Sequence, residues 1–552
     1  MGPHRIAALA ALAVLGCRKP EEPSGGASQR KGLDTLGYLA TMPVGDRETM
    51  VSGVMRLEPR AVAAGITIIC DVAFCNLIDM SGRTVHRIHL SSENLNAGSL
   101  LVDYDDSHFL ILDKEIAKTD WLGKVEWQTH SEDVVFHHDV AVREDKTILA
   151  LYAGERWIAH DGARIPILDN GIATIHADGS FARSVSFFDV LAAKLRPGVL
   201  DEIKQAVEAG TLAVPATRLK RRLKSRFAAF GNITDAFHAN GLTIAPRDTA
   251  KWKQGDYIVC FRELGGNGGV YVIDHSSLAV RWSFEDVEKP HAPSQLPSGN
   301  ILLFDNGPKR QWSRVIEIDP VKNAIVHEYR SQQPLFFSDG GSGVQALPNG
   351  NQLVTEMRRG HVFEITPSGQ VVWDYWNPVS TTESHGKQVR SRAAIYRARR
   401  VTESSSTTIA PLRALVQAEQ RRVASLAPIR KELPPQREAR VYPEGPGPDF
   451  TPFMTFVLTE TAGAITYKAT STALPPGRYR VMVAQHGCGE VLEAPLADLG
   501  TFESTGESGE LALSGSTNGK APEGGLAHLV DLGYLAVLRE GTQRPIACAK
   551  VL

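Results

Sequence analysis

Two stretches of the sequence decide the fold, QLPSGNILLF at residues 295–304 and QALPNGNQLV at residues 345–354. Each places a Leu-Pro-x-Gly-Asn turn before apolar residues. This pattern is typical of an antiparallel hairpin, because glycine adopts the backbone angles that a tight turn requires. Weaker versions of this Leu-Pro hairpin occupy residues 101–112, 140–151 and 242–260. The recurrence indicates a repeat protein.

A second hairpin pattern alternates with the first. It consists of an apolar pair, a polar turn with Asp or Gly, and a β-branched or aromatic run. Its six copies lie at LIDMSGRTVH (77–86), TDWLGKVEW (119–127), IATIHADGSFARSV (172–185), 270–282, 315–329 and 362–373. Two hairpins per unit make four strands, and units of roughly 40 to 50 residues predict a six-bladed β-propeller. A β-sandwich also contains many hairpins, but the regular pairing of two distinct patterns favours the propeller.

Length and composition set the outer limits of the prediction. At 552 residues the chain exceeds one ordinary core, so we expect at least two domains. The formal net charge of -2 gives no general attraction to nucleic acid. A helical insertion is predicted at 190–226, and its basic stretch at 220–226 is interpreted as a solvated helix face.

The N-terminus has the layout of an export signal. A polar start precedes the apolar run 6–15, which is too short to span a membrane, and VLGC at 14–17 resembles a bacterial lipobox, whose cysteine is acylated. We therefore predict a signal peptide at 1–16, a lipid anchor on Cys17 and a flexible tether at 17–36. A plain signal peptide with an incidental cysteine is the alternative.

An exported chain meets oxidising conditions, in which cysteines tend to pair. Cys70 and Cys75 can pair across a tight strand connection. Cys260 lies in the apolar run 257–261 and is interpreted as a buried, inert thiol.

Histidines precede the first strand of several predicted blades. Because the innermost strand of a propeller blade lies near the central channel, we expect these side chains to converge there. Imidazoles with an arginine suit a sulfate or phosphate ligand, and they also suit acid-base or nucleophilic work on a transferring anion. The set comprises His137 and His138 before 140–151, His238 before 242–260, His291 before 295–304, and Arg310 after 302–306, with Gly341 at the equivalent place in the next blade.

Two simpler interpretations stay open. The histidines can instead bond neighbouring strand carbonyls, or they can hold a metal ion. No Asp or Glu recurs with them at ligand-like spacing, so the sequence predicts no metal and no other cofactor.

Four segments give the propeller a more specific resemblance. They are FHANGLTIAP (237–246), KPHAPSQLPSGNILLFDNG (289–307), SRVIEIDP (313–320) and GHVFEITPSGQVVWDYWNP (360–378). They resemble the bacterial arylsulfotransferases, six-bladed propellers that move a sulfuryl group from one phenol to another without a nucleotide donor. The resemblance covers residues 37–378.

The resemblance implies roles for individual residues. His238, His291 and Arg310 match catalytic residues of the family, and His137, His138 and Asn240 are the expected substrate-binding residues. The family also uses a nucleophilic histidine in a later blade, but FFSDGGSGV at 336–344 contains none, and neither His361 nor His385 aligns with it. If activity survives, direct transfer or a substituted nucleophile is required.

The C-terminal part has a different character. After a Ser/Thr-rich and then helical stretch, predicted as a linker at 379–439, short alternating strands resume and predict a compact Greek-key β-sandwich at 440–552. LPPGRYRVMVAQHGCGE (474–490), ADLGTF (497–502) and RPIACAKVL (544–552) resemble Cu,Zn superoxide dismutase, which implies a Cys488–Cys548 disulfide. Val481 and Val483 stand where that family has two copper histidines, so we expect no metal there.

Together these patterns predict an all-β, exported bacterial lipoprotein of the outer membrane, facing the periplasm or the cell surface. Its propeller is expected to transfer a sulfuryl group from an aryl sulfate to a phenol, or to bind such a ligand. The alternative is a non-catalytic propeller that binds a ligand or an envelope partner. The sequence predicts no nucleic-acid partner and does not decide the oligomeric state.

Overall fold

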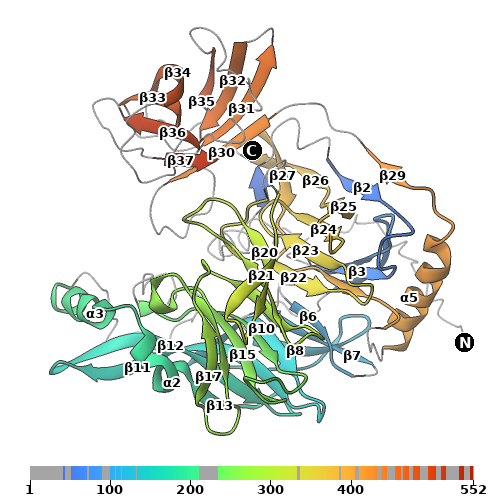
Figure 1. The fold of residues 1–552 in the computed structure, drawn as a ribbon, viewed down its shortest axis with the longest axis vertical. Helices are drawn as coiled ribbons and strands as arrows, with labels where there is room; N and C mark the ends of the chain where they lie inside the picture. Colours follow the sequence, from blue (N-terminus) through green and yellow to red (C-terminus); the bar gives the residue numbers. More distant parts are fainter. Residues whose placement is uncertain are drawn as a thin grey trace, which may run out of the picture.

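Antiparallel sheets arranged around a common axis form the main body of the protein in the computed structural model (Figure 1). The structure describes residues 41–43, 51–70, 74–89, 100–105, 107–113, 115–131, 133–210, 234–331, 336–384, 387–404, 409–431 and eight strands between 437 and 550.

Six of these sheets are the blades of a six-bladed β-propeller, as predicted. Each blade contains four antiparallel strands, in order from the innermost strand outward. The first three blades are β28 (Arg399–Val401), β3 (Ile66–Cys70), β4 (Phe74–Ile78) and β5 (Thr84–His89); β6 (Leu100–Asp103), β7 (His108–Asp113), β8 (Glu115–Asp120) and β9 (Val125–Gln128); β10 (Val134–Val142), β11 (Ile148–His160), β12 (Ala163–Ile175) and β13 (Phe181–Ser186). The last three are β14 (Ala239–Ile244), β15 (Tyr257–Phe261), β16 (Gly269–Ile273) and β17 (Val280–Phe284); β18 (His291–Gln295), β19 (Ile301–Asp305), β20 (Arg314–Asp319) and β21 (Ala324–Tyr329); β22 (Gly343–Ala346), β23 (Gln352–Glu356), β24 (His361–Ile365) and β25 (Val371–Trp376).

The Leu-Pro hairpins form the turns between the first two strands of the fifth and sixth blades. The Leu296 N–H donates to the Asn300 carbonyl at 2.8 Å, and the Leu347 N–H donates to the Asn351 carbonyl at the same distance. Gly299 and Gly350 have φ values of 89° and 85°, in the left-handed region that favours glycine. The repeated sequence pattern therefore reflects a repeated turn.

A buried apolar core fills each of the six interfaces between blades. Between the fourth and fifth blades, Ile258 and Val272 pack in one cluster with Ile301. Between the sixth and first blades, Trp373 shares a cluster with Ile69. Burial of these apolar surfaces on both sides of every blade stabilises a closed ring.

Closure of the ring depends on residues that we expected to be a linker, 379–439. β28 pairs with β3, so the innermost strand of the first blade comes from the chain that follows the sixth blade. β2 (Gly53–Leu57) extends the sixth blade outward and pairs with β29 (Ile429–Arg430), while α5 (Ala410–Val423) packs on the first blade. The described propeller therefore continues beyond Pro378, because β28 follows the sixth blade in the chain and completes the first blade.

Smaller elements decorate the ring. β1 (Thr41–Pro43), β26 (Val379–Ser384) and β27 (Lys387–Ala393) form a three-stranded sheet. In the predicted insertion, α2 (Phe187–Leu191), a 3₁₀ turn (Ala192–Lys194) and α3 (Val199–Glu208) follow the third blade, and α3 buries Val199 and Ile203 against the long β11–β12 hairpin. A further 3₁₀ turn spans Leu264–Gly266. The basic stretch 220–226 lies outside the described residues. None of the described helices is long and apolar enough to cross a membrane.

The C-terminal region is also all-β. Its eight antiparallel strands are ordered β34-β33-β36-β37-β30-β31-β32-β35, with bounds β30 (Arg437–Pro443), β31 (Met454–Thr461), β32 (Ala464–Ser471), β33 (Gly477–Ala484), β34 (Pro495–Ser504), β35 (Leu511–Ser516), β36 (Tyr534–Arg539) and β37 (Ala547–Lys550). The apolar side chain of Val481 is buried.

Two of the cysteine predictions are confirmed. Cys70 and Cys75 form a disulfide at the connection between β3 and β4, and Cys260 is a buried free thiol. Burial raises the pKa of the Cys260 thiol well above its usual value, which keeps it protonated and unreactive. Cys17, Cys488 and the Cys548 side chain lie outside the described residues.

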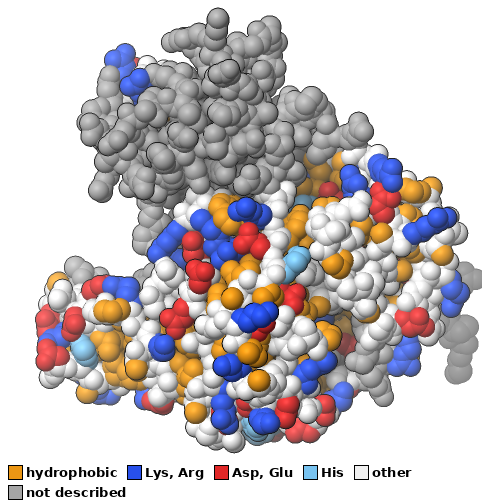
Figure 2. Space-filling model, viewed as in Figure 1, with side chains coloured by type: hydrophobic (Ala, Val, Ile, Leu, Met, Phe, Trp, Pro, Cys, Tyr) orange, Lys and Arg blue, Asp and Glu red, His pale blue; other side chains and the backbone are white. Residues whose placement is uncertain are grey.

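Basic and acidic side chains are interspersed over the described surface seen in Figure 2. This mixture agrees with the net charge of -2 in the sequence.

Candidate functional site

The inner strands of three neighbouring blades are interrupted where the histidines lie. Strand pairing shifts register within 136–140 of β10, 239–241 of β14 and 291–294 of β18. His138 and His238 have φ values of 61° and 43°, which are uncommon for residues other than glycine. Bulges of this kind re-aim side chains and occur often beside active sites.

Four histidine rings meet at these bulges. The centroids of His138 and His238 are 5.0 Å apart, and those of His138 and His291 are 6.1 Å apart. His137 and His138 approach to 2.8 Å between their Nδ1 atoms. Residues from three blades, separated by up to 154 positions in the sequence, therefore form one axial histidine cluster of His137, His138, His238 and His291.

His238 is paired with a carboxylate. Its Nδ1 contacts the side chain of Asp235, which also accepts a hydrogen bond of 3.2 Å from Asn170 Nδ2. Among the described residues, His238 Nε2 is buried and has no hydrogen-bond partner. A carboxylate at Nδ1 holds the proton on that nitrogen and leaves a lone pair at Nε2, which is the arrangement of a general base or nucleophile. Sequence reasoning missed Asp235, although an acid three residues before the histidine was a usable signal.

A second fixed tautomer occurs at His291, which is 1% exposed. Its Nδ1 lies 2.7 Å from Asn306 Oδ1, while Asn306 Nδ2 donates to the Ser338 carbonyl at 2.7 Å. Because the amide nitrogen already donates to a carbonyl, the amide oxygen accepts from His291. The proton of His291 therefore sits on Nδ1, and Nε2 carries a lone pair.

All four axial histidines are neutral at pH 7. Burial lowers the pKa of His137 to about 4 and that of His291 to about 3, and it holds the pKa values of His138 and His238 well below their usual range. Nearby cations, including Arg262, lower the pKa of His238 further. The sequence had suggested charged imidazoles holding an anion; desolvation makes them neutral bases instead.

Arg310 is engaged by other groups. Its guanidinium is 3.0 Å from Asp305 and 3.6 Å from Glu288, and it stacks over the ring of Trp312. These carboxylates already neutralise the cation. The predicted partnership of Arg310 with His238 and His291 is therefore replaced by ion pairs within the fifth blade and its connection.

Arg397 supplies a cation beside the cluster. It lies two residues before β28, and its Nη1 is 3.0 Å from Asp139, the neighbour of His138 in β10. Its Nε and Nη2 are buried without a hydrogen-bond partner among the described residues. The ring of Tyr396 is 5.9 Å from that of His138. Sequence reasoning missed both residues because they precede the closing strand, which had been assigned to the linker.

The other predicted residues occupy supporting positions. Asn240 is fully buried and donates from Nδ2 to the Pro290 carbonyl at 3.1 Å, so it fixes the backbone beside His291. A Cβ atom on Gly341 would lie 1.9 Å from the sulfur of Met357, so Met357 fills the space that a side chain there would need. Met357 is flexible and can move, so the feature that favours glycine at this position is its φ of 60°.

One group of potential metal ligands meets elsewhere in the described part of the chain. Ligand atoms of Asp256, Asp274 and His275 lie within 4.8 Å of one another. Asp274 already accepts hydrogen bonds from Ser276 and Ser277, as in an ordinary turn at the end of β16. Nothing else at this turn points to a metal ion.

Comparison with known proteins places the histidine cluster in a family context. Residues 104–378 match the arylsulfotransferase (ASST) family. The matched region contains the four axial histidines, Asp235 and the first strands of blades three to six. Arg397 and the closing strand β28 lie beyond it.

Solved structures similar to this chain include a protein of unknown function from Bacteroides caccae, at 11% identity over 61% of this chain and 98% of that one, with a TM-score of 0.37. Streptogramin B lyase matches at 10% identity over 66% and 98%, with a TM-score of 0.32. AztD from Citrobacter koseri matches at 10% over 62% and 99%, with a TM-score of 0.31. A search of curated proteins gave no significant match.

Proposed function

We propose that the propeller catalyses transfer of a sulfuryl group from an aryl sulfate to a phenol at the axial histidine cluster. The observation that carries the proposal is the pairing of His238 with Asp235, which leaves His238 Nε2 without a partner among the described residues. Arg397, which is bonded to Asp139 beside His138, adds two buried nitrogen donors, Nε and Nη2, that have no hydrogen-bond partner among the described residues. The match of residues 104–378 to the arylsulfotransferase family supports this chemistry.

The groups allow a balanced direct transfer. The hydroxyl of the acceptor phenol donates to His238 Nε2, and its oxygen attacks the sulfur while its proton passes to that nitrogen. The bond between the sulfur and the donor oxygen breaks, the phenolate leaves with the electron pair, and the proton then moves from His238 to that oxygen. Asp235 stabilises the transient imidazolium, and Arg397 donates to the sulfate oxygens as charge develops on the leaving oxygen.

The neutral cluster also suits a substrate that carries negative charge. A bound sulfate favours protonation of nearby imidazoles and so raises their pKa values from about 4 at His137 and about 3 at His291. Binding is therefore expected to take up protons and to become tighter as the pH falls. Direct transfer fits the sequence at 336–344, which contains no histidine to match the nucleophile of the family.

We also propose that the protein is exported and anchored to the bacterial outer membrane through a lipid on Cys17, facing the periplasm or the cell surface. The basis is the short apolar run followed by VLGC at 14–17. The C-terminal strands are proposed to form a Greek-key sandwich resembling superoxide dismutase, with a Cys488–Cys548 disulfide and without the copper ligands.

A matched pair of arginine variants tests the site. The assay follows 4-nitrophenolate release from 4-nitrophenyl sulfate in the presence and absence of phenol. Arg397→Gln is expected to lower kcat/KM by about 10²- to 10³-fold, because it removes donors to the transferring group. Arg310→Gln removes the same charge from the ion pairs with Asp305 and Glu288, and kcat/KM should change by less than about threefold.

The two variants separate the competing assignments. A large loss only in Arg310→Gln, with both proteins folded by circular dichroism, would return the catalytic role to Arg310 and contradict the proposed site. Phenol-dependent release that is absent from the folded wild-type protein across several donors and acceptors would favour the alternative, a non-catalytic ligand-binding propeller. The absence of a histidine from 336–344 is the observation in favour of that alternative.

A further inference from the structure

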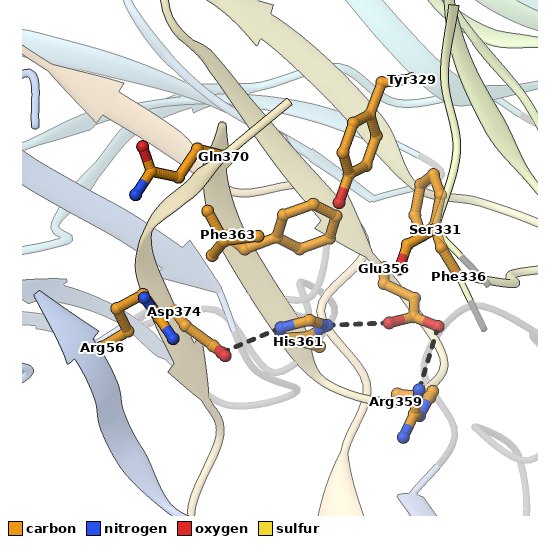
Figure 3. A pocket seen from close by; sticks show the side chains of 11 residues that line it. Arg56, Tyr329, Ser331, Phe336, Glu356, Arg359, His361, Phe363, Gln370 and Asp374 are labelled. Atoms are coloured by element: carbon orange, nitrogen blue, oxygen red, sulfur yellow. Dashed lines mark hydrogen bonds and ion pairs between the residues drawn. The ribbon is translucent and has the colours of Figure 1, made fainter. Parts of the chain in front are cut away.

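A separate pocket lies between the fifth and sixth blades (Figure 3), and none of the axial histidines lines it. Its walls come from the end of β21, from β24 and β25, and from the neighbouring strand β2. The cavity has a volume of about 330 Å³, at the lower end of the range for small-molecule sites. It is large enough for one small ring compound.

One side of the pocket is aromatic. The rings of Phe336 and Phe363 pack edge to face at 5.5 Å, and Tyr329 lies 6.1 Å from Phe336 and 6.0 Å from Phe363. Figure 3 shows these three rings on the same side of the pocket. Burial, together with the negative charges of Glu356 and Asp374, raises the pKa of Tyr329 to about 12, so its hydroxyl stays neutral. A planar aromatic ligand can stack on these rings or pack edge to face against them.

The floor of the pocket holds a charged histidine. His361 Nδ1 lies 2.8 Å from a Glu356 oxygen, and its Nε2 lies 3.0 Å from an Asp374 oxygen. Two carboxylate partners require a proton on each ring nitrogen, so the geometry itself specifies the imidazolium form. The ring is stacked on Trp376 at 4.0 Å, which also favours a cation.

The charges around the pocket do not balance. Glu356 is shared between His361 and Arg359, the latter at 3.6 Å, and Asp374 pairs with His361. The negative charges of these two acids cancel the positive charges of His361 and Arg359. Arg56 therefore remains as an additional cation. Glu58 is 3.9 Å from Arg56 and is held more closely by Arg430, at 2.7 and 3.0 Å. Asp374 lies opposite Arg56 in the β2–β25 pairing and is paired with His361 at 3.0 Å. The lining therefore carries one excess positive charge.

Arg56 lies across the pocket from the aromatic wall, beside Gln370 and on the Asp374 side (Figure 3). Its side chain is 43% exposed, so it can turn toward a ligand without losing a buried partner. Ring surface at one end, and a partly exposed guanidinium with an amide at the other, define the two ends of a small amphipathic ligand.

We propose that this pocket binds a small aromatic monoanion, with its ring against Tyr329, Phe336 and Phe363 and its anionic group at Arg56. The site is distinct from the axial cluster, and the proposal does not depend on sulfuryl transfer. Neutral phenols lack the anionic group, and aromatic amines would place a cation beside Arg56. Both are therefore expected to bind more weakly than aromatic acids of the same size.

Calorimetric titration of the full-length protein with benzoate tests the proposal, with benzyl alcohol as the neutral control and benzylammonium as the cationic control. Arg56→Gln should weaken benzoate binding by at least about tenfold, since it removes the charged end of the site. The control Arg60→Gln removes an exposed arginine outside the pocket lining and should leave binding unchanged. His238→Ala should also leave it unchanged, because benzoate is expected at the pocket and not at the axis.

Quenching or enhancement of tryptophan fluorescence gives a second readout, because Trp376 stacks directly on His361 beneath the pocket. Equal benzoate affinity in the wild type and Arg56→Gln would overturn the proposal, as would benzyl alcohol binding as tightly as benzoate. A loss confined to His238→Ala would place benzoate in the axial site and would also overturn it. Absence of sulfuryl transfer would leave the pocket proposal intact, so the two proposals fail separately.

Discussion

Buried histidines occur in two regions of this protein, and the two regions treat the same side chain in opposite ways. The axial histidines lose their charge on burial, with pKa values lowered to about 4 at His137 and about 3 at His291. His361, in the pocket between the fifth and sixth blades, is also buried, yet Asp374 and Glu356 outweigh desolvation and raise its pKa. Burial alone therefore does not decide the protonation state; the number of carboxylate partners does.

The difference assigns different chemistry to the two regions. A histidine with one carboxylate or amide partner, such as His238 or His291, keeps a lone pair on its other nitrogen and can accept a proton. His361 has both nitrogens occupied and stacks on Trp376, so it has no lone pair to offer. In the two proposals, proton transfer is therefore assigned to the axis and ligand recognition to the outer pocket.

The largest expected effect comes from exchanging the same residue in both regions. His238→Ala should lower kcat for sulfuryl transfer by about 10²- to 10⁴-fold, because it removes the general base. His361→Ala should change kcat by less than about threefold, since its ring lies outside the axial cluster. Initial rates with saturating phenol measure both, and circular dichroism controls for folding. Equal losses of kcat in the two variants would contradict the different roles assigned to the two regions.

The sequence predicted the propeller well because its turns are local. Each Leu-Pro hairpin is specified by only five consecutive residues. One of them is a glycine with φ near 90°, as at Gly299 and Gly350. The end of the ring was not predictable in this way. β28 contributes three residues, and its pairing with β3 joins positions more than 300 residues apart. No local pattern marks such a short closing strand.

The candidate site was predictable in its histidines but not in its partners. Their position just before the first strand of a predicted blade identified His137, His138, His238 and His291. The structure brings these four together. The ion pairs of Arg310 were not predictable, because a long side chain can reach several positions and only the folded chain places Asp305 and Glu288 beside it. The protonation states depend on burial and on Asp235 or Asn306, which only the folded chain assembles.

The two regions should also respond to acid with opposite signs. His291 has a folded pKa of about 3, below the unfolded value, so its contribution to stability is complete above about pH 6.5 and is lost as the pH falls. His361 has a raised folded pKa, so its contribution is complete below about pH 6.5 and is lost as the pH rises through the folded value.

Urea unfolding at pH 8 and pH 5 measures this contrast, and all eight tryptophans lie between residues 121 and 376, so their fluorescence reports on the propeller. Between pH 8 and pH 5, the free energy of unfolding of His291→Gln should fall by about 2 kcal/mol less than that of the wild type. His361→Gln should show the opposite change, a steeper loss of stability toward acid. The same slope in both variants would contradict the assigned protonation states.

The smallest expected effect is the protonation of individual histidine ring nitrogens, which NMR observes directly. In a protein labelled with ¹⁵N-histidine, long-range correlation spectra at pH 7 should show two protonated ring nitrogens for His361, because each faces a carboxylate oxygen at 2.8 or 3.0 Å. His291 should show one, at Nδ1, because Asn306 accepts there and Nε2 has no proton to give. Single-site His→Gln variants assign the signals. A neutral His361 would remove a positive charge from the outer pocket and with it the reason for an anionic ligand. A charged His291 would mean that the axial cluster holds anions as an imidazolium and that the base must be sought elsewhere.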